Sequence, residues 1–404
     1  MFERATPLLA SMPGMASAGF VMRRGRGVRR RVDGAVLQGD GRWAAFDSGR
    51  PFRVASVSKM VTATGFMSLV ARRRIDLDAD VSRYLGAPLR HPAFPDLAIT
   101  PRMLMSHTSG LRNGDDFPVP FNRPLLGRLA AAAGEERYGG WFAPAGEPPG
   151  AWFSYSDTNF AVVAQIIECV TGARFDRFMR ETLFAPLGLD IGYNWSAVPQ
   201  RKRARVAAAC RWIDGVWTAQ VDASPPAAPG IAFYRGEGDT SSTEADHRVG
   251  ENGFAFAPHG GLRLSLDDMD RLAQFYLRAA PLAGEGSLAA MTTPVWTFDP
   301  DAPNGAPERG WYQRYGLGVQ APVGRDAPGA SPGDAFFGAS TPEWRGHFGD
   351  AYGWITGLVW NVRENATLVY AINGMPETNR PPGARSAMSQ PEEAIIDAAL
   401  ATFS

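Results

Sequence analysis

The pattern of apolar and polar positions divides the chain into three stretches. Residues 15–50 alternate apolar and polar positions between glycines, which predicts antiparallel strands. From Ser56 onward apolar residues recur at helical spacing, and up to about residue 245 helices alternate with connections rich in Pro and Gly. The last stretch predicts two strands followed by an amphipathic helix, at 352–362, 366–374 and 389–403.

The order of these elements predicts an α/β fold of the α+β kind, in which helices flank an antiparallel sheet. We expect a discontinuous sheet domain, with residues 1–60 joined to 255–404, and a mainly helical insertion at 61–254 that carries active-site loops. Residues 214–260 are dense in Gly, Pro and Asp without a period. This predicts a long loop, of the kind that covers sites in enzymes.

Composition and charge exclude several classes of function. The 404 residues are 45% hydrophobic and 20% charged, as in a globular protein, and 41 basic residues balance 41 acidic ones. This balance gives no electrostatic basis for binding nucleic acid or an acidic membrane. Cys169 and Cys210 make neither a disulfide framework nor a metal site. The first 20 residues are a poor secretory signal and no run of 18 apolar residues exists, so we expect a cytoplasmic protein. We also expect no cofactor and no metal.

The most informative motif is Ser56-Val57-Ser58-Lys59, an S-x-x-K at a predicted helix start. Residues i and i+3 share a helical face, so the Ser56 hydroxyl and the Lys59 amine can lie within hydrogen-bond reach. Serine needs a neighbouring base to become a nucleophile, and lysine can act as one where arginine cannot. Only two of the 41 basic residues are lysines, which favours a catalytic pair over a chance match. Signatures of the α/β-hydrolase, nucleotide-binding and zinc-protease classes are absent from the sequence.

Four ordered motifs resemble the class C β-lactamase-like serine hydrolases, a superfamily with a β-lactamase/DD-peptidase-like fold. They are VASVSKMVTATGFMSLV, LMSHTSGL, FSYSDTNFAVVAQIIECVTG and FAPLGL, at 54–70, 104–111, 153–172 and 184–189. The superfamily includes class C β-lactamases, family VIII carboxylesterases, and amidases and peptidases of D-amino-acid substrates. The resemblance is weakest at 214–260 and 297–338.

The resemblance implies roles for further residues. Tyr155-Ser156-Asp157 takes the place of the family's Tyr-x-Asn, so Tyr155 is the expected third catalytic residue. A nearby ammonium would lower the pKa of Tyr155 and favour it as a base. Asp157 departs from the family's asparagine, and its carboxylate would hold Lys59 protonated.

The family's Lys-Thr-Gly is matched here by His347-Phe348-Gly349. Histidine is only partly charged at neutral pH, and His347 would position the substrate or polarise Tyr155. Gly349 would let substrate approach the strand, and the backbone N–H of Asp350 would form an oxyanion hole with that of Ser56. We expect His107, in SHTSG, to be structural.

Aromatic residues near these motifs are candidates for the wall of a substrate pocket. The candidates are Trp152, Trp344, Tyr352 and Trp354, although most aromatic residues near a site pack in its core or rim.

These features predict a serine hydrolase that forms an acyl-enzyme on Ser56 with small-molecule substrates. The favoured function is a carboxylesterase acting on short-chain esters, with weak β-lactam hydrolysis. One alternative is an amidase, D-amino-acid peptidase or β-lactamase with the same three residues. Another is a penicillin-recognition module that binds without catalysis. The sequence leaves a homo-oligomer open, as well as the choice between Lys59 and Tyr155 as the base.

Overall fold

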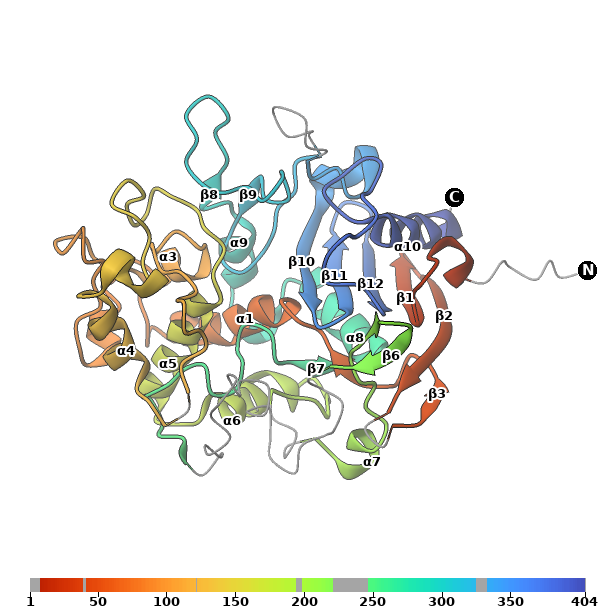
Figure 1. The fold of residues 1–404 in the computed structure, drawn as a ribbon, viewed down its shortest axis with the longest axis horizontal. Helices are drawn as coiled ribbons and strands as arrows, with labels where there is room; N and C mark the ends of the chain where they lie inside the picture. The colour runs from red at the N-terminus through yellow and green to blue at the C-terminus, as the bar shows by residue number, and fades with distance from the viewer. Residues whose placement is uncertain are drawn as a thin grey trace, which may run out of the picture.

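The structure is a computed structural model, and it describes residues 8–38, 41–120, 122–193, 198–220, 246–324 and 333–403. Its centre is a six-stranded antiparallel sheet in the order β10-β11-β12-β1-β2-β3 (Figure 1). The strands are β1 (Ser17–Arg24), β2 (Gly27–Leu37), β3 (Trp43–Ala45), β10 (Trp344–Ala351), β11 (Trp354–Asn361) and β12 (Ala366–Asn373). The two ends of the chain therefore build one sheet, as the alternating pattern predicts.

Helices cover both faces of this sheet. Successive residues of a strand point to opposite faces, so a strand buried on both sides is apolar throughout. Phe20 and Met22 of β1 pack in the core beneath α10 (Gln390–Leu400), whereas Val21 packs in the core on the side of α8 (Leu266–Leu277). A capping box fixes the start of α8, since Ser265 and Asp268 bond each other's backbone N–H groups.

Most of the remaining helices lie on the β10 side of the sheet, to the left in Figure 1, whereas α7 (Gln200–Arg203) is drawn below the sheet at the lower right. The principal helix is α1 (Val57–Ala71), which packs against β10, β11 and α5 (Asp157–Thr171). The other helices are α2 (Ser82–Leu85), α3 (Pro101–Met105), α4 (Leu125–Ala132), α6 (Phe175–Met179), α7 (Gln200–Arg203) and α9 (Ser287–Thr292). The predicted domain boundary at residue 60 falls inside α1, which is continuous across it.

Three short antiparallel strand pairs complete the described strands. They are β4 (Phe52–Arg53) with β7 (Arg263–Leu264), β5 (Cys210–Ile213) with β6 (Val216–Ala219), and β8 (Trp296–Thr297) with β9 (Arg314–Tyr315). The β5–β6 hairpin corrects the start of the loop predicted at 214–260, because Trp212 and Trp217 pair across it. Residues 221–245 of that loop lie outside the described residues. No described helix has both the length and the apolar character needed to span a membrane.

Candidate active site

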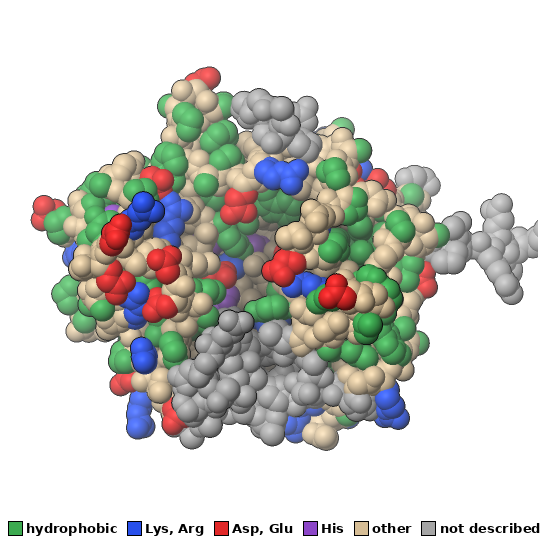
Figure 2. All heavy atoms as spheres, in the orientation of Figure 1, with side chains coloured by type: hydrophobic (Ala, Val, Ile, Leu, Met, Phe, Trp, Pro, Cys, Tyr) green, Lys and Arg blue, Asp and Glu red, His purple; other side chains and the backbone are tan. Residues whose placement is uncertain are grey.

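Figure 2 shows a hollow between the helical part and the sheet. Ser56 lines a cleft together with Tyr155 and Gly349. It is the N-cap residue of α1, so it lies at the positive end of the helix dipole. Ala55 before it has a φ of 48°, a left-handed conformation that costs energy for a residue with a Cβ. This tight turn, with the Ser58 hydroxyl bonded to the Ala55 carbonyl, sets the nucleophile at the surface of the cleft.

Lys59 lies one turn along α1 and is completely buried. Its Nζ donates a hydrogen bond of 3.0 Å to Ser56 Oγ, as the spacing of the S-x-x-K motif predicts. It also donates to the carbonyl of His259 at 3.0 Å and pairs with Asp157 Oδ1 at 2.6 Å. The amine thus has three acceptors at fixed positions.

The Lys59–Asp157 pair determines the charge of the site. Burial lowers the pKa of Lys59 below its usual value, and the Asp157 carboxylate opposes this without reversing it. Burial alone would raise the pKa of Asp157, but Lys59 and neighbouring histidines lower it to about 2. Asp157 is therefore ionised. Its charge favours the protonated form of Lys59, whereas burial favours the neutral amine.

The start of α5 holds Tyr155 and Asp157 in place. Asn113 Oδ1 accepts hydrogen bonds from the backbone N–H groups of Asp157 and Thr158, at 2.9 and 3.2 Å, and so caps the helix from a distant loop. His107 Nδ1 accepts from the N–H of Ser156 at 3.1 Å. We expected a structural role for His107, and this hydrogen bond to the start of α5 is consistent with such a role.

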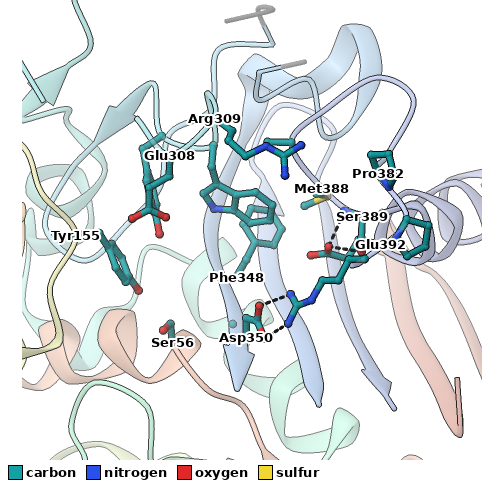
Figure 3. A pocket seen from close by; sticks show the side chains of 16 residues that line it. Ser56, Tyr155, Glu308, Arg309, Phe348, Asp350, Pro382, Met388, Ser389 and Glu392 are labelled. Carbon is teal, nitrogen blue, oxygen red and sulfur yellow. Dashed lines mark hydrogen bonds and ion pairs between the residues drawn. The ribbon is translucent and has the colours of Figure 1, made fainter. Parts of the chain in front are cut away.

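Tyr155 is packed between aromatic rings. Its ring stacks on Tyr312, with centroids 5.1 Å apart, and lies 4.3 Å from the ring of His107. Lys59 Nζ lies 4.6 Å from the Tyr155 ring centroid. The Tyr155 hydroxyl is buried without a hydrogen-bond partner among the described residues, and Figure 3 shows it pointing into the cleft toward Ser56.

The expectation that an ammonium lowers the pKa of Tyr155 is wrong. Burial raises that pKa well above 10, and the negative charge of Asp157 raises it further. A weaker interaction with Ser56 opposes the increase. Burial and the charge of Asp157 together therefore keep the proton on the phenol.

Strand β10 brings Gly349 and Asp350 beside Ser56. A Cβ on Gly349 would lie 2.4 Å from the Val54 carbonyl oxygen and 3.0 Å from the Ser56 nitrogen, so only glycine permits this approach. Thr356 Oγ1 of the neighbouring strand donates to the same Val54 carbonyl at 2.8 Å. The Asp350 side chain forms an ion pair with Arg380.

His347 turns away from the substrate cleft. Its Nδ1 lies 2.6 Å from the Phe348 carbonyl oxygen and must donate to it, so its Nε2 accepts from the Tyr315 hydroxyl at 2.8 Å. Burial lowers the pKa of His347 to about 3. The ring is therefore neutral and does not line the cleft over Ser56, which corrects the expected direct role in positioning substrate.

Of the four aromatic candidates for the pocket wall, only Tyr352 lines a cleft at Ser56. Trp344 and Trp354 are fully buried in the cores on either side of the sheet, stacked on Phe337 and Phe52. Trp152 lines neither cleft at Ser56. The correction has a simple cause, because alternate residues of a two-sided sheet fill its cores rather than a pocket.

Two clefts meet at Ser56. The larger has a volume of about 430 Å³, and Figure 3 shows Glu308, Arg309, Phe348, Met388 and Glu392 among the residues around it. The other, of about 400 Å³, carries Tyr352 with the guanidinium of Arg53 4.8 Å from its ring centroid.

Several lining residues were missed by the sequence reasoning, among them Glu308, Trp311, Tyr312 and Arg380. Three of these lie between 297 and 338, where the motifs are weakest. The cluster of aromatic residues in GWYQRYG, at 310–316, was the one available hint. No group of three or more His, Cys, Asp or Glu within the described ranges could hold a metal ion.

The family model of Beta-lactamase matches residues 4–390. Penicillin-binding protein 4 of Amycolatopsis lactamdurans is 32% identical over 182 residues, which cover 44% of this chain and 44% of that protein. Esterase EstB of Burkholderia gladioli is 30% identical over 211 residues, covering 46% of this chain and 49% of that protein. The chain thus matches less than half the length of these curated relatives.

The solved structure of a class C beta lactamase from Rhodobacter sphaeroides has the same fold. It aligns with a TM-score of 0.63 at 16% identity, covering 98% of each chain. At this identity the likeness concerns the fold alone, and it confirms the predicted β-lactamase/DD-peptidase-like architecture.

Proposed function

Because the chain belongs to the Beta-lactamase family of serine hydrolases, we propose that it is a carboxylesterase for short-chain esters, with weak β-lactam hydrolysis as a secondary activity. The observation that carries the proposal is the hydrogen bond of 3.0 Å from Lys59 Nζ to Ser56 Oγ, beside the Tyr155 hydroxyl, which no described residue bonds. This arrangement suits an acyl-enzyme mechanism on Ser56.

In this mechanism Lys59 acts in its neutral form, which burial favours, and takes the Ser56 proton. Burial lowers its pKa, and Asp157 stabilises the ammonium that forms as Ser56 Oγ attacks the substrate carbonyl. The backbone N–H groups of Ser56 and Asp350 would hold the oxyanion. Tyr155, kept protonated by burial, passes the proton taken by Lys59 to the leaving oxygen, and a water molecule then releases the acyl group by the reverse steps.

The preference for esters is supported by the chemistry around His347. The resemblance places a lysine at this position in β-lactamases, where it offers a cation to a substrate carboxylate. Here the ring is neutral, buried and bonded to Tyr315, while Arg380 in the cleft is paired with Asp350. A similar protein is named as an esterase, which agrees with this preference.

Two alternatives use the same residues differently. An amidase, D-amino-acid peptidase or β-lactamase would share Ser56, Lys59 and Tyr155 and differ in the leaving group that the clefts admit. A binding module without catalysis would not need the Lys59 amine against the serine hydroxyl, so the contact argues against it.

The test compares kcat/KM for p-nitrophenyl butyrate, the matching p-nitroanilide and nitrocefin. We expect the ester to be preferred, Ser56→Ala to lose turnover, and a fluorophosphonate probe to add mass at Ser56. An amide preference of about tenfold, a difference of about 1.4 kcal/mol in transition-state binding, would overturn the esterase proposal. Failure of the probe to label Ser56 would instead favour the binding module.

A further inference from the structure

A carboxylate without a partner faces the nucleophile across the cleft. Figure 3 shows Glu308 on the wall beside Tyr155, with its carboxylate directed into the space above Ser56. The Glu308 carboxylate makes no hydrogen bond or ion pair with any side chain or backbone group in the described parts of the chain. Removing water from a charged carboxylate costs free energy unless a ligand compensates it.

The cations near Glu308 are committed elsewhere. Lys59 is paired with Asp157, and Arg380 is paired with Asp350. Arg309 follows Glu308 in the chain, but Figure 3 shows its guanidinium reaching away from the carboxylate, toward Met388. This wall of the cleft therefore carries negative charge that no described side chain neutralises by direct contact.

Although the residue as a whole remains exposed to solvent, the protein around the Glu308 carboxyl removes much of its water. This desolvation raises its pKa to about 7, with Lys59 lowering it and Asp157 raising it further. A cation bound beside it would shift the carboxyl toward its ionised form.

The backbone holds Glu308 in this place at a cost. Glu308 and Arg309 have φ values of 46° and 60°, in the left-handed region that residues with a Cβ seldom adopt. The turn is closed by hydrogen bonds of 3.1 Å from the N–H of Trp311 to the Glu308 carbonyl and from the N–H of Tyr312 to the Pro307 carbonyl. Tyr312 stacks on Tyr155, so the turn is tied to the catalytic wall.

We propose that Glu308 binds an ammonium group on the acyl part of the substrate. The preferred substrates are then esters or amides of acids that carry a free amine close to the carbonyl, as amino acids do. The carboxylate supplies the charge, and the neighbouring aromatic rings supply faces that attract cations. One carboxylate does not make a divalent-cation site, which needs several oxygen ligands. The inference rests on the proposed acyl-enzyme chemistry at Ser56.

The first experiment compares esters of equal shape that differ in charge. The 4-nitrobenzyl esters of phenylalanine, as each enantiomer, and of 2-methyl-3-phenylpropanoic acid differ by an ammonium in place of a methyl group. We expect kcat/KM for the better phenylalanine enantiomer to be at least about tenfold higher than for the ester with the methyl group. A ratio of about tenfold is what one hydrogen bond to a charged group contributes. Glu308→Gln should lower this ratio at least about tenfold. Glu285→Gln, at an exposed carboxylate outside the clefts, should leave it unchanged.

The second experiment measures binding without turnover. Titration calorimetry on Ser56→Ala compares phenylalaninamide with 2-methyl-3-phenylpropanamide, and the amine should bind at least about tenfold more tightly. Adding Glu308→Gln should remove the difference. Selective binding without hydrolysis of either ester would contradict the proposed function and support the role of Glu308. Equal binding of the two amides, or a ratio that survives Glu308→Gln, would overturn the inference about Glu308.

Discussion

At the scale of single residues, the surroundings of Lys59 explain why this position holds a lysine. Its amine is completely buried and contacts Ser56, Asp157 and the His259 carbonyl within 3.0 Å. The site thus needs a compact amine that can release a proton, and a guanidinium meets neither requirement.

Lys59→Arg should therefore lower kcat/KM by about 10²–10⁴, the usual contribution of a general base. The matched control is Lys202→Arg, at the other lysine of the chain, which lies 3.4 Å from Asp268 and away from the clefts. Ester hydrolysis by both variants, with thermal melting to check the fold, tests this. If Lys59→Arg kept more than about a tenth of the activity, the lysine would not be the base.

Tyr155 gives a prediction that separates catalysis from stability. Among the described residues its buried hydroxyl has no hydrogen-bond partner. Tyr155→Phe should therefore leave the free energy of unfolding unchanged or raise it by up to about 1 kcal/mol. The same variant should have a kcat lower by a factor of about 10²–10⁴, because the phenol no longer transfers a proton to the leaving oxygen.

Tyr315→Phe is the contrasting variant. It removes the donor to His347 Nε2 and should lower the free energy of unfolding by about 1–3 kcal/mol, since a buried nitrogen is left unpaired. Urea unfolding and single-turnover kinetics measure both quantities. A marked loss of stability in Tyr155→Phe would show that its hydroxyl is structural.

At the scale of elements, the site depends on the approach of β10 to the start of α1. Gly349 is the point of contact, and a Cβ there would lie 2.4 Å from the Val54 carbonyl oxygen. Neither the Val54 backbone nor β10 can move easily. Thr356 donates a hydrogen bond to the Val54 carbonyl, and β11 pairs with β10 along its length.

Gly349→Ala should push β10 away from Ser56 and lower kcat by about 10²–10³, the cost of losing one oxyanion donor. Gly127→Ala in α4 is the control, because its Cβ would meet nothing closer than 3.8 Å and should be neutral or stabilise the helix. Kinetics of both variants test the oxyanion role. A fully active Gly349→Ala would place the oxyanion elsewhere.

At the scale of the whole molecule, buried histidines make the stability depend on pH. Burial lowers the pKa of His259 and of His347 to about 3, that of His107 well below 6.5, and that of His91 in the same direction. These rings are neutral in the folded protein and bind protons in the unfolded chain below about pH 6.5. The unfolded state thus gains protons first, so stability falls as the pH falls through this range.

We expect the free energy of unfolding to be lower at pH 5 than at pH 7.5 by about 2 kcal/mol for each of His259 and His347, with His107 acting in the same direction. Urea unfolding at both values measures the difference. In His347→Gln the decrease should be smaller by the contribution of one histidine. Equal stability at the two pH values would mean that these rings are protonated in the fold.

The sequence by itself determined the features that depend on local pattern. Alternating strands at both ends of the chain, the helix that starts at Ser56 and the capping box at Ser265 follow from periodicity and from short-range hydrogen bonds. The contact between Ser56 and Lys59 follows from a spacing of three residues on one helix. Ordered motifs added Tyr155 and Asp157, whose approach to Lys59 no periodicity encodes.

Only the tertiary structure decided how these groups are charged and what surrounds them. Burial reversed the expected pKa shift of Tyr155, because desolvation depends on every residue packed around it. The same packing placed Trp344 and Trp354 in the cores and turned His347 toward Tyr315. It brought Glu308 to the cleft from a segment without a motif. The physical reason is that pairing and burial join residues far apart in the chain, and local sequence carries little information about which distant partner fills a given space.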